Sequence, residues 1–120
     1  MEKISDKTLF LDIDGTLVEH KNPHLTSIPS HVMIVLEGTI EKLLEWNKKG
    51  YTIILTTGRR ESNREVTVKQ LQEAGIFYDQ LIMGVGRGPR IVINDIKPDG
   101  MLTAYSINLV RNLGVKDLDI

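Results

Sequence analysis

The chain has 120 residues, 41% of them hydrophobic, and a formal net charge of -1. This length suits one domain with its own core, and the small net charge argues against a protein that coats nucleic acid or an acidic membrane. The absence of cysteine excludes disulfides and thiolate zinc sites. The sequence shows neither a signal peptide nor a run of roughly 20 apolar residues that would span a membrane. We therefore expect one cytoplasmic domain over residues 1–120, small enough that a homo-oligomer would help to stabilise it.

The first part of the chain predicts a buried strand followed by a long excursion. Residues 8–14 form an apolar run that Gly15 closes, which is typical of a buried strand that ends in a turn. Residues 19–30 are polar and contain two prolines, which predicts a loop. Residues 31–36 are apolar and fit either a second short strand or a buried loop. We interpret residues 19–36 as a flap inserted into the domain.

Two helices with a strand between them are predicted next. Thr39 is a candidate N-cap of a helix that Gly50 ends. Residues 51–56 are β-branched and apolar, which favours a strand. Residues 61–74 have the apolar spacing of an amphipathic helix.

The last third of the chain contains two more apolar runs. Residues 79–83 and 90–94 predict strands, and the glycine-rich loop 84–89 separates them. After Gly100 the apolar spacing fits a helix and a strand equally well. Because strands are separated by helices along most of the chain, we expect a three-layer, Rossmann-like α/β domain with a mostly parallel sheet.

Polar side chains follow three of the predicted strands. Asp12 and Asp14 end the first strand, Thr57 ends the second, and Asp95 follows the run 90–94. In a parallel sheet these ends share one edge, which is where open α/β sheets bind their ligands. This convergence is the main sequence evidence for a functional site, and it argues against the alternative that Asp12 and Asp14 only form an Asp-Gly turn.

The residue types at this edge predict a site for a hard cation. Asp12 and Asp14 lie two apart on a strand, so they point to the same face and repel each other unless a cation lies between them. Asp95 adds a third carboxylate, and oxygen ligands without histidine or cysteine favour Mg²⁺. Asp99 precedes a glycine, so we favour a turn residue over a fourth ligand at this position.

The same groups suit phosphoryl chemistry. A carboxylate can attack phosphorus and form a covalent intermediate. A second carboxylate two residues further on can give a proton to the leaving group and later take one from water. The Thr57 hydroxyl and the amides around Gly58 can stabilise the negative charge of the transferred group.

These residues resemble the motifs of the haloacid dehalogenase superfamily. Its first motif, Asp-x-Asp-Gly-Thr, is present at residues 12–16, and its second, a strand ending in threonine or serine before Gly-Arg, at residues 53–59. Its fourth motif, an acidic pair after a strand, is similar to Asp95 and Asp99. The three motifs keep the family's order over residues 8–99.

The resemblance implies a role for each matching residue. Asp12 is expected to be the nucleophile and Asp14 the general acid and base. The expected Mg²⁺ ligands are Asp12, Asp14 through its backbone carbonyl, and Asp95. The substrate phosphate is expected to bind at Thr56, Thr57, Gly58 and Arg59.

The sequence departs from the family pattern in two ways. The third motif is a basic residue on a helix before the fourth motif, and no helix fits between residues 83 and 91. Candidates for this residue are Arg87, Arg90 and Lys97, of which we prefer Lys97 because it directly follows Asp95. The chain also has no separate cap domain, since the flap is too short to fold as one.

The expected activity is magnesium-dependent hydrolysis of a phosphomonoester through an aspartyl-phosphate, with a small phosphorylated substrate as the partner. A sugar phosphate is favoured, because residues 88–98 look like small members of the superfamily linked with bacterial sugar and surface-polysaccharide synthesis. One alternative is a nucleic-acid end phosphatase, against which the small net charge argues. Another is a non-catalytic interaction domain of the same fold. The intact motif residues argue against it, because a domain without activity has no reason to keep them together.

Overall fold

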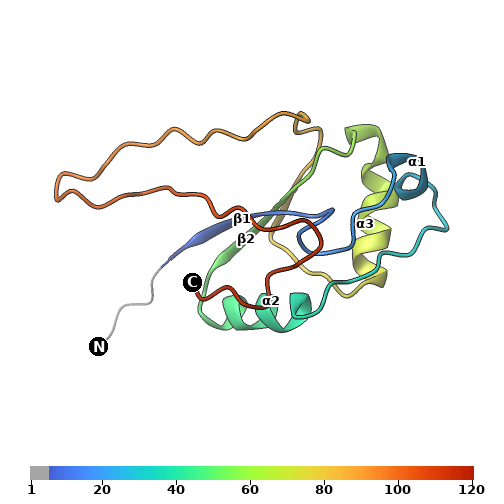
Figure 1. Ribbon diagram of the computed structural model, residues 1–120, viewed down its shortest axis with the longest axis horizontal. Helices are drawn as coiled ribbons and strands as arrows, with labels where there is room; N and C mark the ends of the chain where they lie inside the picture. Colours follow the sequence, from blue (N-terminus) through green and yellow to red (C-terminus); the bar gives the residue numbers. More distant parts are fainter. Residues whose placement is uncertain (1–5) are drawn as a thin grey trace.

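In the computed structural model, which describes residues 6–120, three parallel strands form the sheet (Figure 1). They are β1 (Thr8–Asp12), β2 (Thr52–Thr56) and β3 (Gln80–Ile82), and they lie in this order across the sheet. Asp12 pairs in register with Thr56, and Thr56 pairs with Ile82. The carboxyl ends of the three strands therefore lie side by side, and we call this edge the rim.

Four helices accompany the strands in the described part of the chain. They are α1 (Pro23–Thr26), α2 (Thr39–Lys48), the 3₁₀ helix η1 (Glu61–Asn63) and α3 (Arg64–Glu73). We had expected Thr39 to be the N-cap of α2, but the N-cap is Gly38. The buried Thr39 hydroxyl instead donates a hydrogen bond to the Leu17 carbonyl over 2.8 Å, which ties the start of α2 to the loop after β1.

The core lies between one face of the sheet and the two long helices. Leu11 and Leu55 from the sheet belong to the same buried cluster as Trp46 of α2 and Leu71 of α3. On the opposite face of the sheet Phe10 is 61% exposed. The three strands follow one another across the sheet in sequence order, and the connections between them are right-handed. Such connections place both helices on the same face of the sheet. The α/β class with its parallel sheet is confirmed, whereas the expected third layer is not seen among residues 6–120.

The predicted strand at residues 90–94 is wrong. These residues pair with no strand of the sheet and begin an extended excursion, residues 90–108, which we call the arm. Figure 1 shows the arm leaving the body near the rim and projecting past the end of the sheet where β1 begins. Its tip is a tight turn, in which the Gly100 amide donates to the Lys97 carbonyl over 2.7 Å and Ile96 pairs with Leu102.

The segment after the arm returns to the body. The sequence after Gly100 fitted a helix or a strand, but the structure forms neither there. The segment ends in a turn at residues 111–113, before the buried Val115. No helix within residues 6–120 has the length and the apolar composition needed to cross a lipid bilayer.

Candidate functional site

The end of β1 and the loop after it place two aspartates on the rim. Asp12 is the last residue of β1. The chain then turns tightly, because the amides of Leu17 and Val18 both donate to the Ile13 carbonyl, over 2.9 and 3.2 Å. Gly15 has a φ of 91°, a left-handed conformation that a residue with a side chain rarely adopts. The Asp-Gly-Thr sequence thus holds Asp14 close behind Asp12.

Asp14 is held in a partly buried ion pair. Arg59 donates from Nε to Asp14 Oδ2 over 2.9 Å and from Nη2 to Oδ1 over 2.8 Å, a two-point contact that only a guanidinium makes. The Arg59 side chain is 7% exposed. We had expected Arg59 to bind substrate phosphate, but in the structure its donors are used by the protein itself.

The Arg59–Asp14 pair is supported from α3 and from the flap. Arg59 Nη1 donates to Gln70 Oε1 over 2.6 Å and to Thr67 Oγ1 over 3.3 Å. Gln70 is buried, and its Nε2 donates to the carbonyl of Thr26 over 2.9 Å. This chain of hydrogen bonds fixes the orientation of Asp14 and connects it to α1.

Asp12 lies on the surface but in a partly dehydrated position. Desolvation raises the pKa of its carboxyl above the ordinary value of 3.8, and the nearby negative charge of Asp14 raises it further. The Ile13 amide and the positive charge of Arg90 lower the pKa without cancelling the increase. A carboxylate that is poorly solvated and crowded by a second one is more stable when a cation or a proton is bound to it.

The expected phosphate-binding residues at the end of β2 are also on the rim. Thr57 is buried, and its Oγ1 accepts a hydrogen bond from the Arg59 amide over 3.1 Å. Gly58 is exposed, and a Cβ atom at this position would lie 3.2 Å from the Val85 carbonyl oxygen. The glycine therefore allows the loop after β3 to approach the end of β2 closely.

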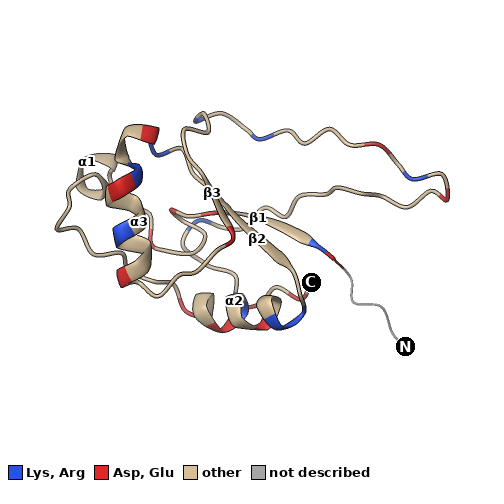
Figure 2. Ribbon diagram, turned by 180° about the vertical axis from the view of Figure 1, so that it is seen from behind, with Lys and Arg blue, Asp and Glu red and all other residues tan. Residues whose placement is uncertain are grey.

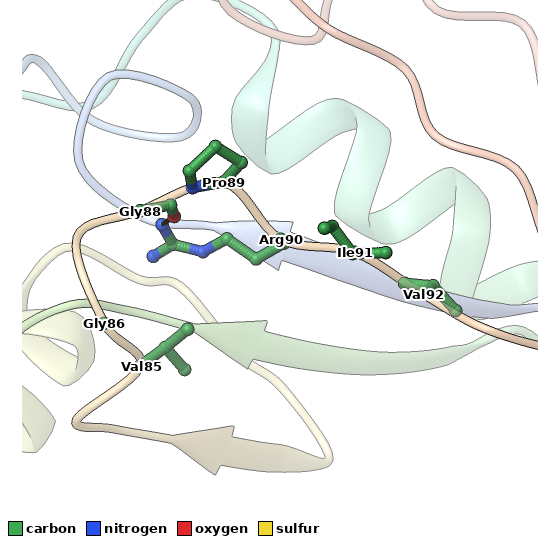
Figure 3. Close-up of a pocket in the computed structure, with 7 residues that line it drawn as sticks. All are labelled: Val85, Gly86, Gly88, Pro89, Arg90, Ile91 and Val92. Atoms are coloured by element: carbon green, nitrogen blue, oxygen red, sulfur yellow. Dashed lines mark hydrogen bonds between the residues drawn. The ribbon is translucent and has the colours of Figure 1, made fainter.

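Arg90 is the basic residue nearest to these groups among our three candidates for the third motif. Its Nη2 is 4.0 Å from the Cβ position of Gly58, and its charge acts on Asp12. Figure 3 shows its side chain reaching back toward Gly88, to whose carbonyl Nη1 donates over 2.8 Å. The same loop borders an open pocket of about 480 Å³ at the base of the arm.

Asp95 and Lys97 are not on the rim of their own chain, contrary to our expectation. Both lie beside the turn at the tip of the arm, where Ile96 pairs with Leu102 and the Gly100 amide bonds to the Lys97 carbonyl, and Figure 2 shows charged residues near this tip. Our prediction assumed that residues 90–94 run toward the rim, whereas the arm begins there and runs away. Asp99 acts as a turn residue, since its Oδ1 accepts a hydrogen bond from the Met101 amide over 3.0 Å.

The sequence analysis missed two residues that contact the loop after β1. The Asn112 amide donates to the Gly15 carbonyl over 2.8 Å, and Asn112 Oδ1 accepts from the His20 amide over 2.7 Å. Asn112 has a φ of 67°, and asparagine is one of the few residues that adopt this conformation readily. The Arg111 side chain lies against Gly15, 3.2 Å from its Cβ position. An asparagine two residues before a glycine was the only local signal for this contact.

We expect Asn112→Ala to destabilise the fold by about 1–2 kcal/mol, because it loses the acceptor for His20 and forces alanine into a left-handed conformation. Asn112→Asp is the matched control, since aspartate keeps an acceptor oxygen and tolerates the same φ. Urea unfolding of the two variants measures the difference. Equal stabilities for them would show that neither the hydrogen bond nor the conformation matters.

A second prediction follows from the raised pKa of Asp12. In EDTA at pH 7, Asp12→Asn should have a higher melting temperature than the wild-type chain. The raised pKa means that the folded chain binds the Asp12 proton more tightly than the unfolded chain does. Protonated Asp12 therefore stabilises the fold fully only below the pKa of the unfolded chain, near 3.8. This stabilisation is lost as the pH rises through the pKa of the folded chain. The advantage of asparagine should therefore shrink as the pH falls through this window. Asp119→Asn, at an exposed position, is the control. A wild-type chain that is more stable than Asp12→Asn at pH 7 would contradict the raised pKa of Asp12.

The donor set of one chain fits Mg²⁺ only in part. Asp12 offers a carboxylate that a cation would stabilise, and main-chain carbonyls of the following loop are close to it in sequence. The side chain of Asp14 is already paired with Arg59. Among residues 6–120 no three acidic or histidine side chains lie close enough together to hold a metal ion. Mg²⁺ often uses one or two carboxylates together with water and substrate phosphate, so Asp12 is a suitable but incomplete anchor.

Comparison with solved structures supports the fold. The chain is similar to one in a structure of the Pnkp1/Rnl/Hen1 complex, with a TM-score of 0.55 and 25% identity over 74% of this chain and 32% of that one. It is also similar to MCSG target APC26283 from Vibrio cholerae, with a TM-score of 0.53 and 21% identity over 88% of this chain and 84% of that one. The chain thus spans about a third of the length of the first of these. A search of curated proteins found no match.

The sequence also matches a known family. The match to haloacid dehalogenase-like hydrolases covers residues 9–83, which is more than half of the chain. This range includes β1 with Asp12, the loop with Asp14, and the end of β2 with Thr57. The chain therefore belongs to the haloacid dehalogenase-like hydrolases.

Proposed function

We propose that this chain is a magnesium-dependent phosphohydrolase that forms an aspartyl-phosphate on Asp12. The observation that carries the proposal is the position of Asp12: its carboxylate ends β1 on the rim, in register with Thr56 and next to the loop that holds Asp14. Partial dehydration makes this carboxylate more reactive than one in bulk water, and Arg90 supplies positive charge near it.

The reaction takes place in two steps. In the first, an oxygen of Asp12 forms a bond to phosphorus, the ester bond to the leaving group breaks, and the leaving oxygen takes a proton from Asp14. In the second, Asp14 takes a proton from a water molecule whose oxygen attacks phosphorus, and the bond between Asp12 and phosphorus breaks. The products are an alcohol and inorganic phosphate, and both aspartates return to their starting states.

Arg59 controls when Asp14 can take part. Both carboxylate oxygens of Asp14 accept hydrogen bonds from Arg59, so at least one of these contacts must open before Asp14 carries a proton. The pair keeps Asp14 oriented between turnovers. Its link through Gln70 to Thr26 makes the flap a candidate for releasing it.

The other residues of the rim bind and orient the transferred group. Thr57 and the amides near Gly58 face the phosphoryl oxygens, and Arg90 balances their charge. A bound Mg²⁺ would supply further positive charge to the phosphoryl group and would be held by Asp12.

We favour a small substrate such as a sugar phosphate, because binding a long phosphate backbone normally needs an excess of basic residues, and the net charge of this chain is -1. A nucleic-acid end phosphatase is the second candidate. It is supported by the similarity to a chain of a complex described as an RNA repair complex, at 24% identity and a TM-score of 0.54.

The test is a phosphatase assay with an aryl phosphate, with and without Mg²⁺, followed by a panel of phosphosugars and end-phosphorylated oligonucleotides. We expect activity that EDTA removes and Mg²⁺ restores. Mg²⁺ at a hundredfold excess over its Kd should also stabilise the fold by about 2.7 kcal/mol, if it binds only the folded chain. A chain that hydrolyses no phosphoester and whose melting temperature does not change with millimolar Mg²⁺ would contradict the proposal.

A further inference from the structure

The arm exposes an apolar segment that a stable monomer would bury. Ile91 is 81% exposed and Ile93 is 89% exposed, and Tyr105 on the returning limb is also exposed. Between Ile91 and Asn94, and again from Met101 to Asn108, the arm carries no charged residue. An extended, apolar segment with free backbone groups is a surface that pairs with another chain.

The sheet has a free edge that matches this segment. β1 pairs only with β2 among residues 6–120, so the other edge of β1 has backbone donors and acceptors available. Phe10, in the middle of β1, leaves an apolar side chain exposed on the open face of the sheet.

The arm cannot pair in parallel with β1 of its own chain. Only residues 83–89 connect β3 with Arg90, and a parallel pairing needs a crossover of about a dozen residues or more. The arm therefore starts at the rim and runs away from it. At about 3.3 Å per residue, the five steps from Arg90 to Asp95 place Asp95 roughly 17 Å along the arm from its base.

A second copy of the chain removes this obstacle. A two-fold axis across the arm exchanges base and tip, so the arm of the partner runs opposite to this arm and parallel to β1. The tip of the partner's arm then comes to the rim of this chain. That tip carries Asp95 and Lys97, whose side chains have no hydrogen bond or ion pair with residues 6–120. Asp95 would bring the rim a third carboxylate, which one chain lacks, and Lys97 would add a second cation to Arg90.

We infer that two copies of this chain exchange their arms, so that residues 90–94 of each copy extend the sheet of the other at β1 and its Asp95 and Lys97 complete the site at Asp12. This inference rests on the proposed function for the roles of Asp95 and Lys97, but the exchange itself does not. In such a dimer Asp95 adds the missing carboxylate for Mg²⁺, and Lys97 adds a cation for the transferred group.

The first test is the mass of the protein in solution, measured by light scattering and sedimentation. The wild-type chain should be a dimer at micromolar concentration, and Ile91→Lys/Ile93→Lys should be a monomer with an unchanged circular dichroism spectrum. Leu44→Lys, which alters an exposed apolar residue of α2, is the control and should remain a dimer. A monomeric wild-type chain, or a dimer that the arm variant leaves intact, would overturn the exchange.

The second test asks whether the site is shared. Asp12→Asn and Asp95→Asn chains are produced together with different affinity tags, and the mixed dimer is purified. Each variant alone should be inactive, while the mixed dimer should have about half of the wild-type activity, because one of its two equivalent sites combines an intact Asp12 with an intact Asp95. An inactive mixed dimer would show that Asp95 does not act across the dimer. If the wild-type chain itself is inactive, the proposed function fails, and the mass measurement still decides the exchange.

Discussion

Replacing Asp12 with asparagine should abolish turnover and leave no acid-labile phosphoenzyme. An amide is a poor nucleophile and a weaker ligand for a cation, so the first step cannot start. Removing a charge that Asp14 crowds should at the same time leave the fold intact, so the loss of activity would not reflect unfolding. Rapid quench with a labelled aryl phosphate measures the phosphoenzyme directly.

Asp14→Asn is the informative comparison. Proton transfer by a positioned side chain is worth about 10²–10⁴ in rate, so this variant should retain a trace of activity and form phosphoenzyme from an activated ester. Unlike Asp12→Asn, it should be less stable than the wild-type chain, since it leaves the buried Arg59 without its carboxylate. Near-normal turnover by Asp12→Asn would refute the covalent mechanism.

Replacing Arg59 with leucine should destabilise the fold by up to about 3–5 kcal/mol, the cost of removing one partner of a fully buried ion pair, since the Arg59 side chain is 7% and that of Asp14 19% exposed. The change leaves the Asp14 carboxylate and Gln70 Oε1 without the donors that now satisfy them. Arg59→Lys should lose less, because an ammonium keeps the charge but cannot contact both oxygens of Asp14 in the same plane. Urea unfolding at low temperature measures these free energies.

The neighbouring Arg60 provides the control for Arg59. Arg60 is exposed, so Arg60→Leu should change stability by no more than about 0.5 kcal/mol. In the double variant Asp14→Asn/Arg59→Leu no buried charge lacks a partner, and its loss should be smaller than the sum of the two single losses. Arg59→Leu and Arg60→Leu of equal stability would show that the ion pair contributes nothing to the fold.

The sequence by itself determined the local elements and the residues of β1 and β2 at the rim. The apolar run before Asp12, the β-branched run before Thr57 and the helical spacing of residues 61–74 all depend on neighbouring residues, and the structure contains β1, β2 and α3 at these places. Family membership rests on the same local patterns, since the match covers residues 9–83.

The tertiary structure alone decided which side chains meet and which way the arm runs. Arg59 has two chemically sound uses, and only its 2.9 Å contact with Asp14, 45 residues earlier, shows that it is bound internally. Residues 90–94 have the composition of a buried strand, but strand direction depends on the length of the preceding connection and on free sheet edges, which periodicity does not encode. The seven residues 83–89 between β3 and Arg90 are too few for a crossover. For this physical reason Arg90 lies near Asp12, while Asp95 and Lys97 lie at the far end of the arm.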